Sequence, residues 1–228
     1  MITLAVDTAL AACSAAVLDT ARGEASAVER IKPMLRGHAE ALMPLLQGLL
    51  AESGRSLSEI DRFAVTIGPG TFTGIRVGIS AIRGLALATG RRAVGVTTLA
   101  AMAETARMAG FDDRPVLVAL DARRGEIYAQ AFTADGVELG PARVAPVAAV
   151  IAELPGSVAS VVGSAAELCA RQAQAVGRNL ACLGHDAAPR PGAVARLAVK
   201  ADADTRPAPL YLRPPDARPQ DGAAIPRQ

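Results

Sequence analysis

The chain has 228 residues, a length that suits one or two domains with an ample core. Half of the residues are apolar (51%), but the apolar runs are broken by Gly, Arg or Glu well short of the roughly 20 residues that a membrane span needs. A net charge of +2 and an aromatic content of 3% favour neither a basic stripe for strong nucleic-acid binding nor a stacking platform for single-stranded RNA.

The N-terminus and the cysteines indicate a compartment. Met1–Leu4 lack the basic region of a signal peptide and are typical of a first strand. The three cysteines, Cys13, Cys169 and Cys182, are odd in number, widely spaced and without a C-x-x-C pair, which argues against a zinc site and a disulfide framework. We therefore expect a cytoplasmic protein with reduced thiols.

The first elements predicted in chain order are a hairpin and a helix. Residues 3–9 and 13–18 form two apolar strands, the first of which reaches Asp7. Leucines at spacings of three and four between Leu42 and Leu50 predict a helix over 37–53 with an apolar stripe, which Ser53 and Gly54 end.

The most informative stretch runs from Gly68 to Gly78, between a predicted strand (62–67) and a predicted helix (73–89). Gly68, Pro69 and Gly70 predict a tight turn, after which Thr71 or Thr73 can cap the helix. Two interpretations remain open. One is a corner that needs small residues for packing, and the other is an anion site at a helix N-terminus. The helix is apolar nearly all round, so we expect its own sheet to cover one side and a partner or another domain to cover the other, with an ordinary core helix as the alternative.

A strand at 93–96 and a helix at 97–109 follow, and then the pattern of the first hairpin returns. An offset of 114 takes Asp7 to Asp121 and places strands at 117–123 and 127–132. This repeat predicts two duplicated α/β lobes, 1–110 and 111–213, with a strand at 158–162 and a helix at 165–174 in the second. The last segment of the second lobe is expected to return to the first. Residues 214–228 have the composition of a disordered tail.

Several separated motifs resemble the TsaB family, also called YeaZ. They are Gly-Pro-Gly-Thr-Phe-Thr-Gly-Ile-Arg-Val-Gly (68–78), the opening Leu-Ala-Val-Asp-Thr-Ala (4–9), Leu-Asp-Ala-Arg-Arg-Gly-Glu-Ile-Tyr (120–128) and Pro-Leu-Tyr-Leu-Arg (209–213). The resemblance implies an α/β fold of two duplicated lobes, that of the actin, hexokinase and Hsp70 (ribonuclease H-like) superfamily.

Asp7 and Asp121 occupy positions where nucleotide-dependent members of that superfamily hold a metal–phosphate group. Those enzymes follow the Asp with a glycine-rich turn, so that backbone amides approach phosphate. Here residues 8–12 contain no glycine, and the turn after Asp121 has only Gly125 beside Arg123 and Arg124. These arginines could bind phosphate or a carboxylate, or contact a partner or tRNA. We interpret both aspartates as vestigial and expect no catalytic residue and no cofactor.

The sequence also lacks motifs typical of a metal site or of a catalytic nucleophile. The related family TsaD carries a His-x-x-x-His pair on its first helix, whereas His38 here is followed four residues later by Leu42. The other histidine, His185, lies in a loop-like stretch, so we expect no metal site. No Gly-x-Ser-x-Gly occurs, which leaves a peptidase without a visible nucleophile.

The resemblance implies a function as well. A TsaB protein is a non-catalytic partner, a pseudo-enzyme subunit, of TsaD in the complex that makes threonylcarbamoyladenosine next to the anticodon of tRNAs reading codons that begin with A. The resemblance also implies that TsaE joins the complex and that the chain encounters tRNA as part of that complex. It further implies a homodimer when TsaD is absent. The alternative is an active ATPase or small-molecule kinase of the same superfamily that uses Asp7 and Asp121.

The expected site residues fall into two groups. The partner interface comprises the apolar stripes of the two N-terminal helices: Leu42, Leu45, Leu46, Leu49, Ile75, Ile79 and Ile82. The signature turn comprises Gly68, Pro69, Gly70, Thr71, Phe72, Thr73, Gly74 and Arg76.

Overall fold

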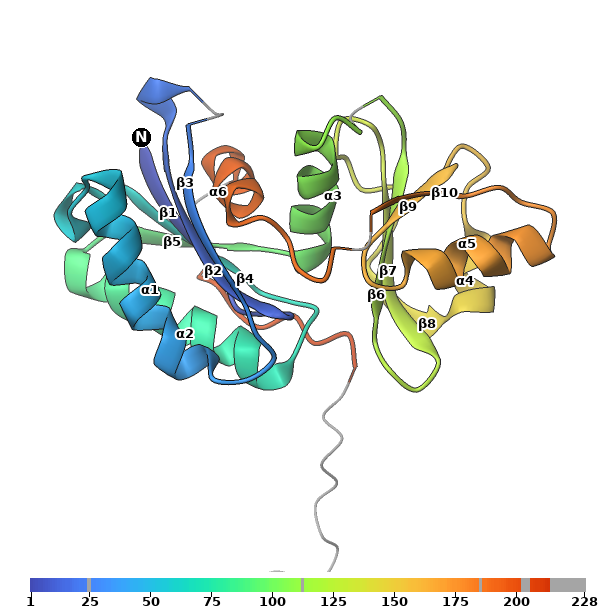
Figure 1. Ribbon diagram of the computed structural model, residues 1–228, viewed down its shortest axis with the longest axis horizontal. Helices are drawn as coiled ribbons and strands as arrows, with labels where there is room; N and C mark the ends of the chain where they lie inside the picture. Colours follow the sequence, from blue (N-terminus) through green and yellow to red (C-terminus); the bar gives the residue numbers. More distant parts are fainter. Residues whose placement is uncertain (24–25, 112, 185, 202–205, 214–228) are drawn as a thin grey trace, which may run out of the picture.

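The computed structural model describes residues 1–23, 26–111, 113–184, 186–201 and 206–213, which form two lobes side by side (Figure 1). The predicted disordered tail, 214–228, and His185 lie outside the described residues. The strands are β1 (Ile2–Asp7), β2 (Ala12–Asp19), β3 (Val28–Pro33), β4 (Arg62–Thr66), β5 (Arg92–Val96), β6 (Val116–Asp121), β7 (Glu126–Phe132), β8 (Arg143–Pro146), β9 (Ser160–Val162) and β10 (Ala181–Gly184). The α-helices are α1 (His38–Ser53), α2 (Phe72–Thr89), α3 (Thr98–Met108), α4 (Val147–Glu153), α5 (Ala166–Ala175) and α6 (Pro191–Lys200).

The two sheets have the same topology. Their orders are β3-β2-β1-β4-β5 and β8-β7-β6-β9-β10, and in each the first three strands are antiparallel while the last two run parallel to the central strand. The register differs by one residue between the two hairpins, because Asp7 pairs with Ser14 and Asp121 with Ile127. The shared strand order confirms the predicted α/β class with two duplicated lobes.

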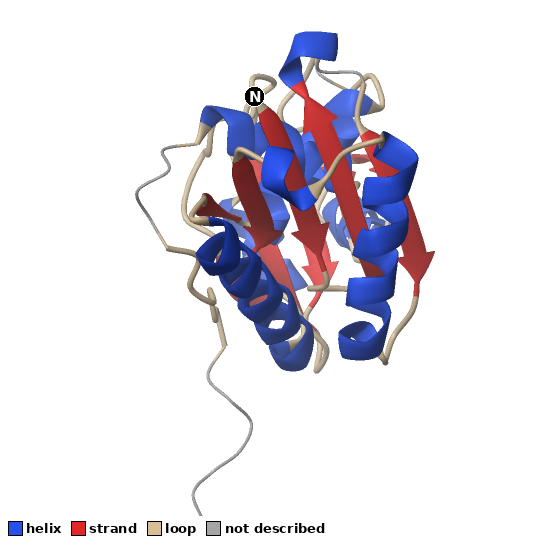
Figure 2. Ribbon diagram, turned by 90° about the vertical axis from the view of Figure 1, so that its left-hand side faces the viewer, coloured by secondary structure: helices blue, strands red, loops and turns tan. Residues whose placement is uncertain are grey.

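The first sheet is covered on both faces, which explains why β1, β2 and β4 are almost wholly buried. One face packs against α1 and α2 through side chains such as Val6, Phe63 and Ile79. Figure 2, which turns this side of the molecule towards the viewer, shows helices in front of the strands. The other face carries small residues such as Ala5 and packs against α6.

The last helix of each half packs against the sheet of the other half. Helix α3 follows β5 of the first lobe but packs on the second sheet, and α6 follows β10 but packs on the first sheet (Figure 1). The two helices meet between the lobes. There the buried carboxylate of Glu104 on α3 is ion-paired with Arg107 (2.7 Å) and with Arg196 of α6 (3.0 Å). This junction joins the lobes through a charge as well as through apolar packing.

The predicted helices and strands agree with the observed ones to within two residues. Five observed elements were not predicted from the sequence: β3, β8, α4, β10 and α6. Helix α4 is only seven residues long, and β8 and β10 have only four residues each, so none of them gives enough residues for a periodic signal. Among the described residues, no helix is long and apolar enough to cross a membrane.

The junction gives a first prediction. Glu104→Ala removes the carboxylate from two partly buried guanidinium groups, and breaking such a buried pair costs about 3 kcal/mol or more. Urea denaturation should show the free energy of unfolding fall by that order. Glu167→Ala is the matched control, because its pair with Arg171 is exposed and contributes about 0.5 kcal/mol or less. Equal losses in the two variants would contradict a structural role for the junction.

Candidate functional site

The signature turn sits at a corner where α2 begins directly against the β1–β2 turn. The Thr71 amide donates to the Ala9 carbonyl oxygen (2.7 Å), and the Thr8 hydroxyl donates to the Gly74 carbonyl oxygen (2.7 Å). Thr71 caps the helix, since its hydroxyl accepts from the Gly74 amide (3.2 Å). The corner therefore joins two segments that are about sixty residues apart.

The glycines of the turn are required by this close approach. A Cβ at Gly70 would overlap the Ala9 carbonyl, and one at Gly74 would overlap the Thr8 carbonyl, both closer than 3.0 Å. At Gly78 it would come within 2.5 Å of the Thr8 hydroxyl. Carbonyl oxygens thus occupy the start of α2, where an anion would otherwise meet amide N–H groups. The geometry supports the packing interpretation of the turn.

Gly68 has a further requirement, because its backbone adopts φ +112°, a conformation that favours glycine. Its carbonyl oxygen accepts from the Thr98 amide (2.8 Å) and so fixes the start of α3. The Gly68–Pro69 peptide bond is cis.

Asp7 is fully buried at the end of β1. One of its carboxylate oxygens accepts from the Thr66 hydroxyl (2.5 Å) and from the Ala9 amide (3.2 Å). Burial raises the pKa of Asp7 from 3.8 to about 6, against the opposing effects of these two hydrogen bonds and of nearby His38. The Asp7 carboxylate is thus enclosed by protein groups.

Asp121, the equivalent residue of the second lobe, is exposed. Its backbone amide donates to the Ser164 hydroxyl (3.0 Å), and its carboxylate accepts from the Arg123 amide (2.7 Å). Arg123 and Arg124 have φ of 62° and 57°, followed by Gly125 at 77°, so the tip of this turn is left-handed throughout. The two aspartates therefore have opposite environments.

The remaining candidate groups are held in the core. His38 begins α1 as a buried residue, and its Nε2 lies 3.2 Å from the Leu10 carbonyl oxygen. Burial raises the pKa of Cys13 and of Cys169 to about 11, so both thiols stay protonated at neutral pH. Within the part of the chain that the structure describes, no three His, Cys, Asp or Glu side chains gather closely enough to hold a metal ion.

The expected partner interface needs a correction. Six of its seven residues are at most 3% exposed and form the core beneath α1 and α2: Leu42, Leu46, Leu49, Ile75, Ile79 and Ile82. The sequence identified the apolar stripes, but the sheet of the same lobe covers them. Only Leu45 is partly accessible, and it lines a hollow of about 450 Å³ between α1 and β3. The exposed large apolar side chains of α1 and α2 are instead Met43 (46%), Phe72 (41%) and Leu87 (85%).

Sequence reasoning also missed a cluster of side chains brought together by the segment 206–213. The Leu210 amide donates to the Ile67 carbonyl oxygen (2.8 Å), so this segment lies along the signature turn. Tyr211 then stacks on Phe72 with ring centroids 5.0 Å apart and accepts a hydrogen bond from Arg76 (2.9 Å). Residues 72 and 211 are too far apart in the chain for any local pattern to have paired them.

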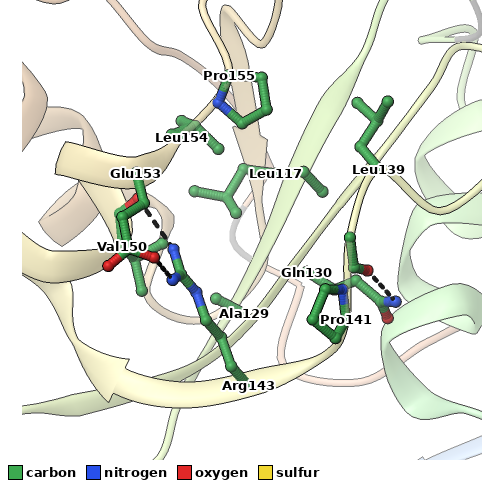
Figure 3. Close-up of a pocket in the computed structure, with 12 residues that line it drawn as sticks. Leu117, Ala129, Gln130, Leu139, Pro141, Arg143, Val150, Glu153, Leu154 and Pro155 are labelled. Atoms are coloured by element: carbon green, nitrogen blue, oxygen red, sulfur yellow. Dashed lines mark hydrogen bonds and ion pairs between the residues drawn. The ribbon is translucent and has the colours of Figure 1, made fainter.

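A separate hollow of about 260 Å³ lies in the second lobe, between β7 and the short helix α4 (Figure 3). Its walls include Leu117, Ala129 and Leu154, and the ion pair of Arg143 with Glu153 lies beside it. It contains none of the predicted site residues.

Comparisons with known proteins place this geometry in a family. The family model of TsaD, tRNA N6-adenosine threonylcarbamoyltransferase, matches residues 31–188. The solved structure of YeaZ from Pseudomonas aeruginosa superposes with a TM-score of 0.74 at 30% identity, over 92% of this chain and 99% of that one. This chain belongs to the TsaB (YeaZ) family.

Two relatives define the extent of the sequence likeness. TsaB of Escherichia coli K12, a tRNA threonylcarbamoyladenosine biosynthesis protein, is 42% identical over 125 residues, which is 55% of this chain and 52% of that protein. An uncharacterized protein of Mycobacterium tuberculosis is 32% identical over 95% of this chain and 93% of its own length. The alignments thus span about half the length of the first curated TsaB relatives.

The corner gives a prediction about glycine. Gly74→Ala should lower the free energy of unfolding, because the added methyl group would overlap the Thr8 carbonyl of the β1–β2 turn. Gly84→Ala is the matched control in the same helix, since a Cβ there meets nothing within 4 Å. It should stabilise by up to about 1 kcal/mol through helix propensity. Thermal unfolding of both variants measures these changes in stability. A Gly74→Ala variant more stable than the wild type would contradict the close approach of α2 to the Thr8 carbonyl.

Asp7 gives a prediction about pH. Between pH 3.8 and about 6, Asp7 holds its proton in the folded state but has lost it in the unfolded state. The free energy of unfolding therefore falls as the pH rises through this range, and ionised Asp7 destabilises the fold above it. Asp7→Asn should therefore be more stable than the wild type at pH 7.5, by about 3 kcal/mol. At pH 4 the two proteins should be nearly equal in urea denaturation. A variant less stable than the wild type at pH 7.5 would contradict this account.

Proposed function

We propose that this TsaB-family chain is a non-catalytic partner of a TsaD-type transferase in the formation of threonylcarbamoyladenosine in tRNA. The observation that carries the proposal is the closed corner at the start of α2. Phosphoryl chemistry depends on amide groups and cations placed around the phosphates. In this chain the Thr8 and Ala9 carbonyl oxygens lie against α2 instead, and Asp7 is enclosed by its own lobe.

The outer face of α1 and α2 supports a partner role. Leu87 on α2 is 85% exposed and Met43 on α1 is 46% exposed, and a Cβ at Gly84, three residues before Leu87, would meet nothing within 4 Å. Exposed apolar side chains beside a small residue suit close packing of a further helix. We propose that TsaD docks on this face, that the same face closes a homodimer without TsaD, and that TsaE joins the complex in the cytoplasm.

The docking face gives a prediction that separates surface from core. Leu87→Glu should weaken binding to TsaD and the homodimer about tenfold or more while leaving the monomer folded, because a charge replaces an exposed apolar contact. Leu168→Glu, at a 44% exposed site on α5 of the second lobe, should change neither. Sedimentation analysis with and without TsaD measures TsaD binding and homodimer formation for each variant. Equal binding by the two variants would exclude this face as the docking site.

The function itself is tested by reconstitution. A mixture of TsaD, TsaE, tRNA, ATP and the threonylcarbamoyl donor should transfer the group to tRNA quickly only when this chain is added. Transfer at an unchanged rate without the chain would overturn the proposed function. Loss of transfer in Leu87→Glu, with Leu168→Glu active, would connect the activity to the docking face.

A further inference from the structure

The segment 206–213 ties the two lobes together along one edge of the molecule. Its Leu210 amide binds Ile67 in the first lobe, while Arg213 donates to the Ala122 carbonyl oxygen (2.7 Å) and pairs with Glu126 in the second. In Figure 1 this segment runs from the first lobe towards the β6–β7 turn. It thereby places the start of α2 and the Arg123 turn on the same edge.

Two features of this edge suit a nucleic acid. Phe72 (41% exposed) and Tyr211 (39%) form a stacked pair of rings at the surface, and the Arg76 guanidinium lies 3.6 Å from the centre of the Phe72 ring. Unpaired bases stack on such exposed rings and guanidinium planes.

The second feature is charge that no carboxylate neutralises. Within the described residues, neither Arg76 nor Arg123 has an ion-pair partner, and both side chains are exposed. The nearby acids are engaged elsewhere, since Glu126 pairs with Arg213 and the Asp121 carboxylate accepts from the Arg123 amide. Guanidinium groups of this kind bind phosphate oxygens well.

We propose that this edge, defined by Phe72, Arg76, Tyr211 and Arg123, is a tRNA contact of this chain. The rings stack on an unpaired base, and the arginines bind flanking phosphates. The inference rests on the proposed function and extends it, because the chain then holds the substrate as well as the partner. An acidic protein surface is the competing occupant, and the experiment below separates the two.

The test uses the reconstituted complex with an unmodified transcript of a tRNA that reads a codon beginning with A. Tyr211→Ala should raise the KM for tRNA about 5- to 150-fold, which is the loss expected for one stacked base. Tyr211→Phe keeps the ring and should stay near the wild-type value. Affinity for TsaD, measured separately, should not change in either variant.

Arg123→Gln provides an independent test that leaves the segment 206–213 untouched. It should raise the KM for tRNA and reduce the slope of log KM against log salt concentration by about one, as expected for one phosphate contact. Arg171→Gln, an exposed arginine on α5, is the control and should change neither quantity.

The outcomes separate the inference from the proposed function. If wild-type chain supports transfer but both Tyr211→Ala and Arg123→Gln keep the wild-type KM for tRNA, the RNA contact is wrong and the function stands. If these variants instead lose affinity for TsaD, the edge is a protein contact and the inference is overturned. If wild-type chain does not stimulate transfer, the proposed function itself fails.

Discussion

The close approach of α2 to the β1–β2 turn is the constraint on which the rest of the structure depends. The corner positions α2 through the Thr71–Ala9 hydrogen bond, α3 through the Thr98–Gly68 bond, and the segment 206–213 through the Leu210–Ile67 bond. Elements from both halves of the chain therefore converge on the signature turn. Small residues at Gly70 and Gly74 allow this arrangement, because any side chain there would overlap backbone carbonyl groups.

Duplication explains the architecture, and the departures from symmetry explain the proposed role. The two sheets share one topology, and a left-handed glycine also follows β9, where a Cβ at Gly163 would overlap the Ala119 carbonyl. Yet Asp7 is buried and Asp121 exposed. One half has thus closed over its aspartate, while the other presents the equivalent aspartate on an exposed turn with two arginines.

Much of the fold could be predicted from the sequence because the signals were local. The leucine spacing of α1, the glycine turn before α2 and the repeated Asp hairpins each lie within a few residues. The sequence could not tell which neighbour covers an apolar stripe, so Leu46 and Ile79 were assigned to an interface although the sheet of the same lobe buries them. It also could not pair Phe72 with Tyr211, because that contact depends on the return of 206–213 to the first lobe. The exchange of α3 and α6 between the lobes is a tertiary effect of the same kind.

We propose that the closed corner leaves this chain without phosphoryl chemistry of its own. The most direct measurement is the release of inorganic phosphate by the purified chain with ATP and magnesium, with the Asp7→Asn variant beside it. The account predicts that the wild type releases no more phosphate than the variant, because the buried Asp7 carboxylate is enclosed by Thr66 and Ala9. Phosphate release by the wild type that Asp7→Asn abolishes would contradict the account and identify the chain as an active ATPase.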